Sequence, residues 1–119
     1  MDELIGRLVG DVGIDRAAAE KAVGIILDFL AKEGPPDKLK SFVAKLPGAD
    51  TLMQKAAADG AGGGMGGVMG AGMRMMGAGL SMGQVQDVVR HFITYARGKV
   101  GEDELGAFVA AIPGLAQFV

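Results

Sequence analysis

The chain matches itself, without a gap, when it is shifted by 66 positions. Nine of the 36 residue pairs that begin with residues 13–48 are identical. The agreement is closest where Phe42-Val43-Ala44 meets Phe108-Val109-Ala110 and where Pro47-Gly48 meets Pro113-Gly114. A repeat of this length indicates two similar units that bury their apolar faces against each other. We therefore predict one domain over 1–119, with repeat one at 1–56, a glycine-rich linker at 57–66 and repeat two at 67–119.

Apolar residues recur at helical spacing in both repeats. Repeat one has a first stripe of Leu4, Ile5, Leu8, Val9 and Val12, a central one of Ala19, Ala22, Val23, Ile25, Ile26, Leu27, Phe29 and Leu30, and a third of Leu39, Phe42, Val43 and Leu46. A further short helix is predicted over 49–58. Repeat two has Val85, Val88, Val89, Phe92, Ile93 and Ala96, then Leu105, Phe108, Val109 and Ile112. The predicted fold is all-α, a compact helical bundle built from two tandem pseudo-symmetric helical repeats.

Residues that start and stop helices stand at the ends of these stripes. Gly13 breaks the first pattern, and Asp15 can cap the helix that follows. Pro35 and Pro36 stop the central helix of repeat one, and Pro36 suits the first turn of the next helix. In repeat two, Ser81 and Gln84 form a capping box, and the acidic run Glu102-Asp103-Glu104 favours a helix start. Phe42 and Phe108 are predicted to lie in matching buried environments.

Composition excludes several classes of function. Twelve basic and fourteen acidic side chains give a net charge of −2, which offers no electrostatic footprint for a nucleic acid. The chain has no cysteine and one histidine, so thiolate catalysis, disulfides and sites with two imidazoles are excluded. The acidic start Met1-Asp2-Glu3-Leu4 lacks the basic region of a signal peptide, and we expect a cytoplasmic protein.

The segment 60–80 is the least polar part of the chain. Ten of its residues are glycine and Arg74 is its one charged residue, so a membrane-spanning helix is disfavoured. The repeat register instead predicts a helix over 67–78. Met65, Met69, Met73 and Met76 would share one face of such a helix, and Gly62, Gly66 and Gly70 are spaced four apart. Glycine within a helix costs about 1 kcal/mol relative to alanine, so this helix needs a close packing partner.

Several roles fit this segment. Thioethers can bind Cu(I), flexible methionines can line a groove for partner helices, and small residues spaced four apart permit close self-association. Alternatively, this segment binds nothing and serves as a core helix or as a mobile hinge. We predict an interaction surface used by a second copy or by another protein, made of Met65, Gly66, Met69, Gly70, Met73 and Met76.

No set of catalytic residues emerges from the sequence. His91 is flanked by Arg90 and Phe92, and we interpret it as partly buried, because no nucleophile and base pattern surrounds it. An enzyme would require a pocket that brings His91 together with a carboxylate from another helix. The acidic run at 102–104 lacks the spaced ligands of a calcium loop, and Lys38, Lys40 and Lys45 fit a solvated helix face. No cofactor or metal is predicted.

The motif Leu-x-x-Phe-Val-Ala-x-Leu/Ile-Pro-Gly occurs at Leu39 to Gly48 and again at Leu105 to Gly114. With the central apolar helix before it, the motif resembles small bacterial proteins of unknown function, including the Vcg-type proteins. The resemblance is strongest over the last 40 or so residues. It implies a bacterial origin and an all-helical fold, and it carries over no activity or site residue.

These observations favour a non-enzymatic helical interaction module that associates with itself. The alternative is a protein that contacts a membrane surface or binds a small apolar ligand through Met69, Met73 and Met76.

Overall fold

The apolar stripes fold into helices joined by short connections. The computed structural model describes residues 2–34, 36–46, 48–59 and 67–111, and all elements within these ranges are helical. They are α1 (Asp2–Arg7), η1 (Leu8–Val12), α2 (Arg16–Glu33), α3 (Pro36–Ala44), α4 (Ala49–Asp59), α5 (Gly67–Gly77), α6 (Met82–Val100) and α7 (Glu102–Ala111). The all-α prediction is confirmed.

The predicted caps start the two long helices. The Asp15 carboxylate accepts a 2.7 Å hydrogen bond from the Ala18 backbone N–H. Ser81 and Gln84 form the full capping box, with Ser81 Oγ accepting at 3.2 Å and Gln84 Oε1 accepting at 2.9 Å. Gly13 and Gly79 precede these caps with φ values of +84° and +106°, which side-chain-bearing residues rarely adopt.

The first stripe is only partly as predicted. After Arg7 the helix widens into the π-helical turn η1. Leu4, Ile5 and Leu8 are buried, but Val9 is 39% exposed. Val9 lies about 100° around the helix axis from Leu8, at the edge of the stripe, so the prediction that it belongs to the buried face is wrong.

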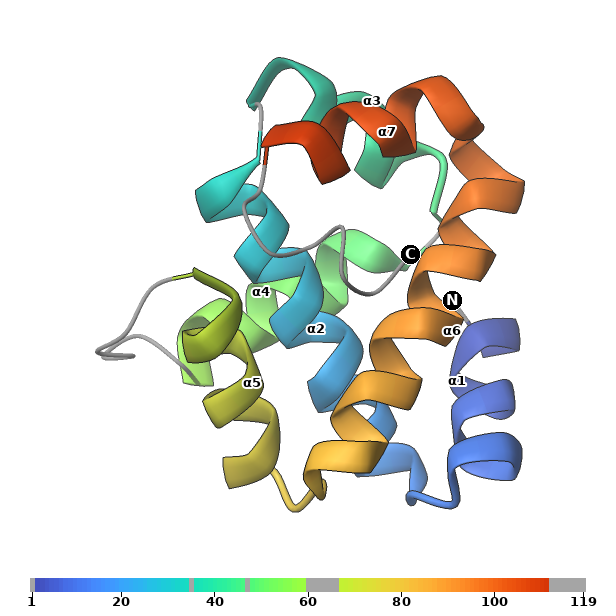
Figure 1. Ribbon diagram of the computed structural model, residues 1–119, viewed down its shortest axis with the longest axis vertical. Coiled ribbons are helices and arrows are strands. Elements are labelled where there is room, and N and C mark those ends of the chain that lie inside the picture. Colours follow the sequence, from blue (N-terminus) through green and yellow to red (C-terminus); the bar gives the residue numbers. More distant parts are fainter. Residues whose placement is uncertain (1, 35, 47, 60–66, 112–119) are drawn as a thin grey trace.

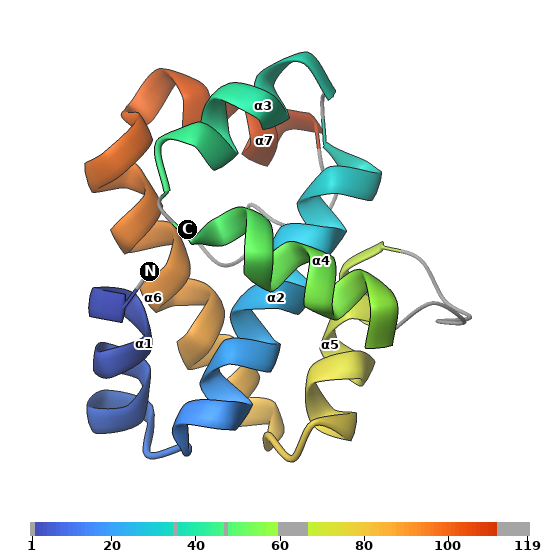
Figure 2. The ribbon, with the colours of Figure 1, turned by 180° about the vertical axis from the view of Figure 1, so that it is seen from behind.

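The two long helices α2 and α6 occupy the middle of the molecule (Figure 1). Helix α1 flanks α6 on one side, and α5 flanks α2 on the other. Seen from behind, α4 lies across α2 (Figure 2). Helices α3 and α7 run side by side across one end, which brings together segments far apart in the sequence. No described helix is both long and apolar enough to span a bilayer.

Phe42 and Phe108 join α3 to α7. Both side chains are fully buried, and their ring centroids lie 4.8 Å apart. Phe92 on α6 completes the cluster, with its centroid 6.2 Å from that of Phe42. Burial of both rings is as predicted, and their contact places the two halves of the chain in one core.

An ion pair lies beside this aromatic cluster. Lys45 Nζ is 2.9 Å from Glu104 Oε2, so Lys45 is more than part of a solvated face and Glu104 does more than start α7. Hydrogen bonds from the Ser41 hydroxyl and then from Lys45 lower the pKa of Glu104. The ionised carboxylate thus holds α7 against the segment that ends α3.

Helices α2 and α4 approach closely at Gly24. A Cβ added to Gly24 would lie 2.5 Å from the backbone oxygen of Leu52 and 3.1 Å from Cβ of Ala56. Only a residue without a side chain allows this approach. Because α4 also borders one of the two cavities described below, Gly24 helps to set the shape of that cavity.

Candidate functional site: two cavities on either side of helix α5

An apolar groove opens between α2, α5, α6 and α7. Its volume is about 150 Å³. The described residues lining it are Ile26, Phe29, Leu30, Ala71, Gly72, Met73, Met75, Met76, Met82, Val85, Gln86, Val89, Phe92, Ile93, Leu105 and Phe108. None of them is charged, and Gln86 supplies the polar side chain of the set. We call this cavity the apolar groove.

Exposed methionines border the apolar groove. Met73, Met76 and Met82 are 58%, 44% and 57% exposed, and all three also line the groove. Large apolar side chains left this open to water in one place mark a surface that another apolar surface can cover. Their flexible thioethers can adapt to the shape of what binds.

Helix α5 contains the predicted interaction residues that can be placed. Met65 and Gly66 lie outside the described residues, and of Met69 only its position in α5 is described. Met73 and Met76 are exposed at the apolar groove. Gly70, predicted on the same surface, is instead buried. The structure therefore moves the candidate surface toward the end of α5 and adds Met82 from α6.

The apolar groove depends on small residues in α5. A Cβ added to Gly72 would meet no heavy atom within 4 Å, so the space beside this position is open. The methyl group of Ala71 fills little more space than a glycine does. Met75, by contrast, is 2% exposed and forms part of the core. Gly72 therefore keeps space open beside this helix. Of the glycines predicted to permit close packing, Gly62 and Gly66 lie outside the described residues, and Gly70 is buried.

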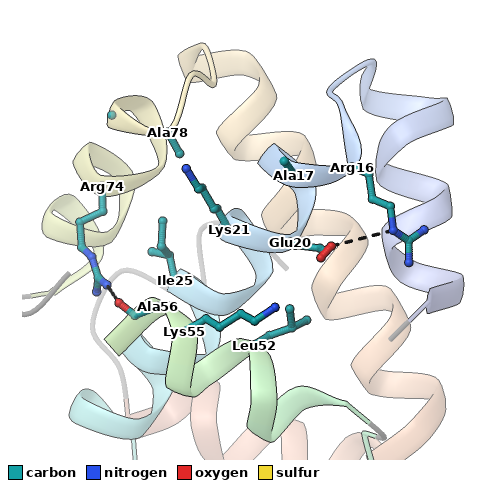
Figure 3. Close-up of a pocket in the computed structure, with 11 residues that line it drawn as sticks. Arg16, Ala17, Glu20, Lys21, Ile25, Leu52, Lys55, Ala56, Arg74 and Ala78 are labelled. Atoms are coloured by element: carbon teal, nitrogen blue, oxygen red, sulfur yellow. Dashed lines mark hydrogen bonds and ion pairs between the residues drawn. The ribbon is translucent and has the colours of Figure 1, made fainter. Parts of the chain in front are cut away.

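A second cavity lies on the other side of α5, between α2, α4 and α5. Its volume is about 740 Å³. The described residues that line it are Arg16, Ala17, Glu20, Lys21, Ile25, Leu52, Lys55, Ala56, Arg74, Gly77 and Ala78 (Figure 3). We call this cavity the basic cleft, since four of these side chains are cationic and one is acidic.

Arg74 closes one side of the basic cleft. Its Nη1 donates to Asp28 Oδ2 at 2.8 Å, and its Nη2 donates to the Ala56 backbone oxygen at 2.9 Å (Figure 3 shows the second bond). Lys32 Nζ lies 3.0 Å from the same Asp28 oxygen. Burial raises the pKa of Asp28, but the hydrogen bonds from Arg74 and Lys32 outweigh burial and lower it overall. Asp28 is therefore an ionised anchor that joins α5 to α2.

His91, the histidine considered for catalysis, lies away from both cavities. His91 is half-buried, as interpreted from the sequence, and it lines neither the apolar groove nor the basic cleft. Among the described residues, no three His, Asp or Glu side chains gather as they would around a metal ion.

Sequence reasoning missed the Asp28–Arg74 pair and the basic cleft. A signal was present, because Asp28 interrupts the central apolar stripe between Leu27 and Phe29, and Arg74 is the one charge in 60–80. A charged residue on a buried face needs an opposite charge close by. Which cation would reach Asp28 depends on where α5 packs, and the sequence does not specify that position.

No family model matches the chain, and the searches of curated proteins and of solved structures found no match either. The resemblance to the Vcg-type proteins and the cytoplasmic location stay predictions. Function is therefore inferred from the two cavities themselves.

Proposed function

We propose that this protein is a non-enzymatic helical interaction module that associates with a second copy of itself through the apolar groove and the exposed methionines beside it. The observation that carries the proposal is the juxtaposition of an uncharged hollow with Met73, Met76 and Met82, which project from its border. Association would remove these thioethers from water, with a gain of about 25 cal/mol for each Å² of apolar surface buried.

A second copy suits this surface because a two-fold interface must be complementary to itself. The surface holds both a hollow and the side chains that can fill one, so each chain can insert Met73 and Met76 into the groove of the other. None of the described residues that line the groove is charged, and two copies can face each other there without like-charge repulsion.

The size of the apolar groove also favours inserted side chains. Sites for drug-sized ligands measure roughly 300–1,000 Å³. The groove measures about 150 Å³, which suits a few side-chain atoms better than a whole ligand of that kind. A small apolar ligand or a membrane surface at the same methionines is the competing occupant, and the experiment below distinguishes these.

We propose further that the chain consists of two tandem pseudo-symmetric repeats. When shifted by 66 positions, the bounds of α2 and α3 fall within one residue of those of α6 and α7. The N-cap residues of α2 and α6, Asp15 and Ser81, are also 66 positions apart. On this basis α1 with η1 corresponds to α5, and the two flank opposite long helices in Figure 1.

The repeat supplies an origin for the apolar groove. Repeat one buries the large side chains of Leu4, Ile5 and Leu8 in the core. The corresponding positions of repeat two hold Gly70, Ala71 and Arg74, and the Arg74 side chain turns toward Asp28 and the basic cleft. Space that apolar side chains fill in repeat one is thus left open in repeat two.

The test is the mass of the protein in solution. Sedimentation equilibrium from low to high micromolar concentration should show a dimer for the wild-type chain. The double substitution Met73→Glu and Met76→Glu should give a monomer with unchanged helical content, because it places charges in the interface while both positions are exposed in the single chain.

Thr94→Glu, at an exposed position of α6 outside the apolar groove, is the control for added charge and should stay dimeric. A wild-type monomer at high micromolar concentration would overturn the proposal. So would a dimer that survives the double substitution. A monomer that binds detergent or vesicles through Met73 and Met76 would instead favour the small-ligand or membrane alternative.

A further inference from the structure

The basic cleft concentrates positive charge in an acidic protein. The whole chain carries a net charge of −2. Among the described residues, the cleft lining nevertheless includes Arg16, Lys21, Lys55 and Arg74 against the one carboxylate of Glu20. Such a cavity attracts anions, because its low-dielectric walls concentrate the field of the charges that line it.

Two of these cations are available to a ligand. Arg74 already donates to Asp28 and to the Ala56 backbone oxygen, and Arg16 lies 3.1 Å from an Asp2 oxygen and 3.9 Å from a Glu20 oxygen. Lys21 on α2 and Lys55 on α4 have no ion-pair partner within the part of the chain that the structure describes.

The surface between these lysines is apolar. Ile25 from α2, Leu52 and Ala56 from α4, and Ala78 after α5 line the same cleft. In Figure 3, Ile25 lies next to Lys21, on the side of the cleft toward Arg74, and Lys55 lies below it. Two ammonium groups beside an apolar surface can bind a molecule that has an anionic head and a hydrocarbon tail.

We propose that the basic cleft binds a single-chain anionic amphiphile, such as a free fatty acid. The exposed ammonium groups of Lys21 and Lys55 supply the counter-charge for the carboxylate head, and the alkyl chain covers Ile25, Leu52 and Ala78. The volume of about 740 Å³ lies within the size range of small-molecule sites. This site is separate from the apolar groove, because α5 stands between the two.

The test is calorimetric titration of the full chain with dodecanoate below its micelle concentration. Wild-type protein should bind, and Lys21→Gln with Lys55→Gln should weaken binding about tenfold, since each exposed charge pair contributes somewhat under 1 kcal/mol. Lys38→Gln with Lys40→Gln, on α3 and outside the cleft, is the matched control and should bind as wild type does. Dodecanol, which has the same tail without the charge, should bind more weakly than dodecanoate.

Further titrations identify which anionic head group the cleft accepts and where the hydrocarbon tail of the ligand lies. Dodecyl phosphate should bind as dodecanoate does, because the two share an anionic head on one chain, whereas inorganic phosphate should bind far more weakly. Amide shifts on titration should fall on Ile25, Leu52 and Ala78. The Met73→Glu, Met76→Glu protein should still bind, which separates this proposal from self-association.

The proposal is overturned if dodecanoate fails to bind or if the lysine substitutions leave its affinity unchanged. Equal affinity for dodecanol, or amide shifts confined to the apolar groove, would overturn it as well. Binding to anionic phosphatidylglycerol vesicles through Lys21 and Lys55, without binding of free dodecanoate, would replace it with docking to a membrane surface.

Discussion

The guanidinium of Arg74 on α5 lies 2.8 Å from the carboxylate of Asp28 on α2, and the two side chains are only 19% and 5% exposed. Their contact fastens the glycine-rich helix to the centre of the fold. We expect Asp28→Asn to lower the free energy of unfolding by about 3–5 kcal/mol, because it leaves a part-buried cation without its counter-charge. Urea unfolding followed by circular dichroism measures this loss.

Lys32→Met is the control for that substitution. Lys32 contacts the same carboxylate oxygen at 3.0 Å, but its side chain is 60% exposed. Solvent screens such a pair, so the loss should be at most about 1 kcal/mol. Equal losses for Asp28→Asn and Lys32→Met would contradict the anchoring role of Arg74.

Asp28 and Glu104 predict how stability depends on pH. The pKa of each carboxyl is lowered in the folded chain, so near and below the ordinary carboxyl pKa of about 4 the unfolded chain binds more protons. Their stabilisation is fully present above that value and is lost as the pH falls through the folded pKa values. Between neutral and acidic pH, the free energy of unfolding should fall less steeply for Asp28→Asn than for wild type. If the free energy falls in parallel for the two proteins, Asp28 does not contribute to the pH dependence of stability.

Gly24→Ala tests the close approach of α2 and α4. The new Cβ would lie 2.5 Å from the Leu52 backbone oxygen, so α4 must shift, and overpacking of this kind typically costs about 1–3 kcal/mol. Gly98→Ala is the matched control in α6, where a Cβ meets nothing within 4 Å. It should raise stability by up to about 1 kcal/mol through helix propensity. If thermal unfolding shows that both substitutions change stability in the same direction, α2 and α4 do not cross as closely as described.

Phe42→Ala and Phe108→Ala test whether the two halves of the chain share one core. Each ring is fully buried and touches the other, so each substitution should cost about 3–5 kcal/mol. The double variant should lose less than the sum of the two single losses, because the contact between the rings is removed only once. A strong loss for one and tolerance of the other would contradict the proposed pseudo-symmetry as well.

Much of the helical architecture could be predicted from the sequence, because local chemistry determines it. Asp15, Ser81 and Pro36 mark helix starts whichever way the helices pack, and the stripes containing Phe42 and Phe108 identify buried faces. Val9 was placed wrongly because it stands at the edge of its stripe, where residue spacing alone does not separate a buried side chain from an exposed one.

The candidate site was harder to predict because cavities are what packing leaves unfilled. The spacing of Met73 and Met76 indicated a shared face, and both are exposed beside the apolar groove. Nothing in the spacing showed that Gly70 would be buried or that Gly72 would border open space. Lys21 and Lys55 stand 34 residues apart in the sequence, and only the crossing of α2 and α4 brings them to one cleft.

The most direct test of self-association is contact between the methionines of one copy and the apolar groove of another. In a mixed sample, one copy carries ¹³C-labelled methionine methyl groups and the other carries protonated valine in a deuterated background. Isotope-filtered nuclear Overhauser spectra should show cross-peaks from Met73 and Met76 methyl groups to Val89 of the other copy. A dimer whose spectra lack these cross-peaks, or a sample that stays monomeric, would contradict the account.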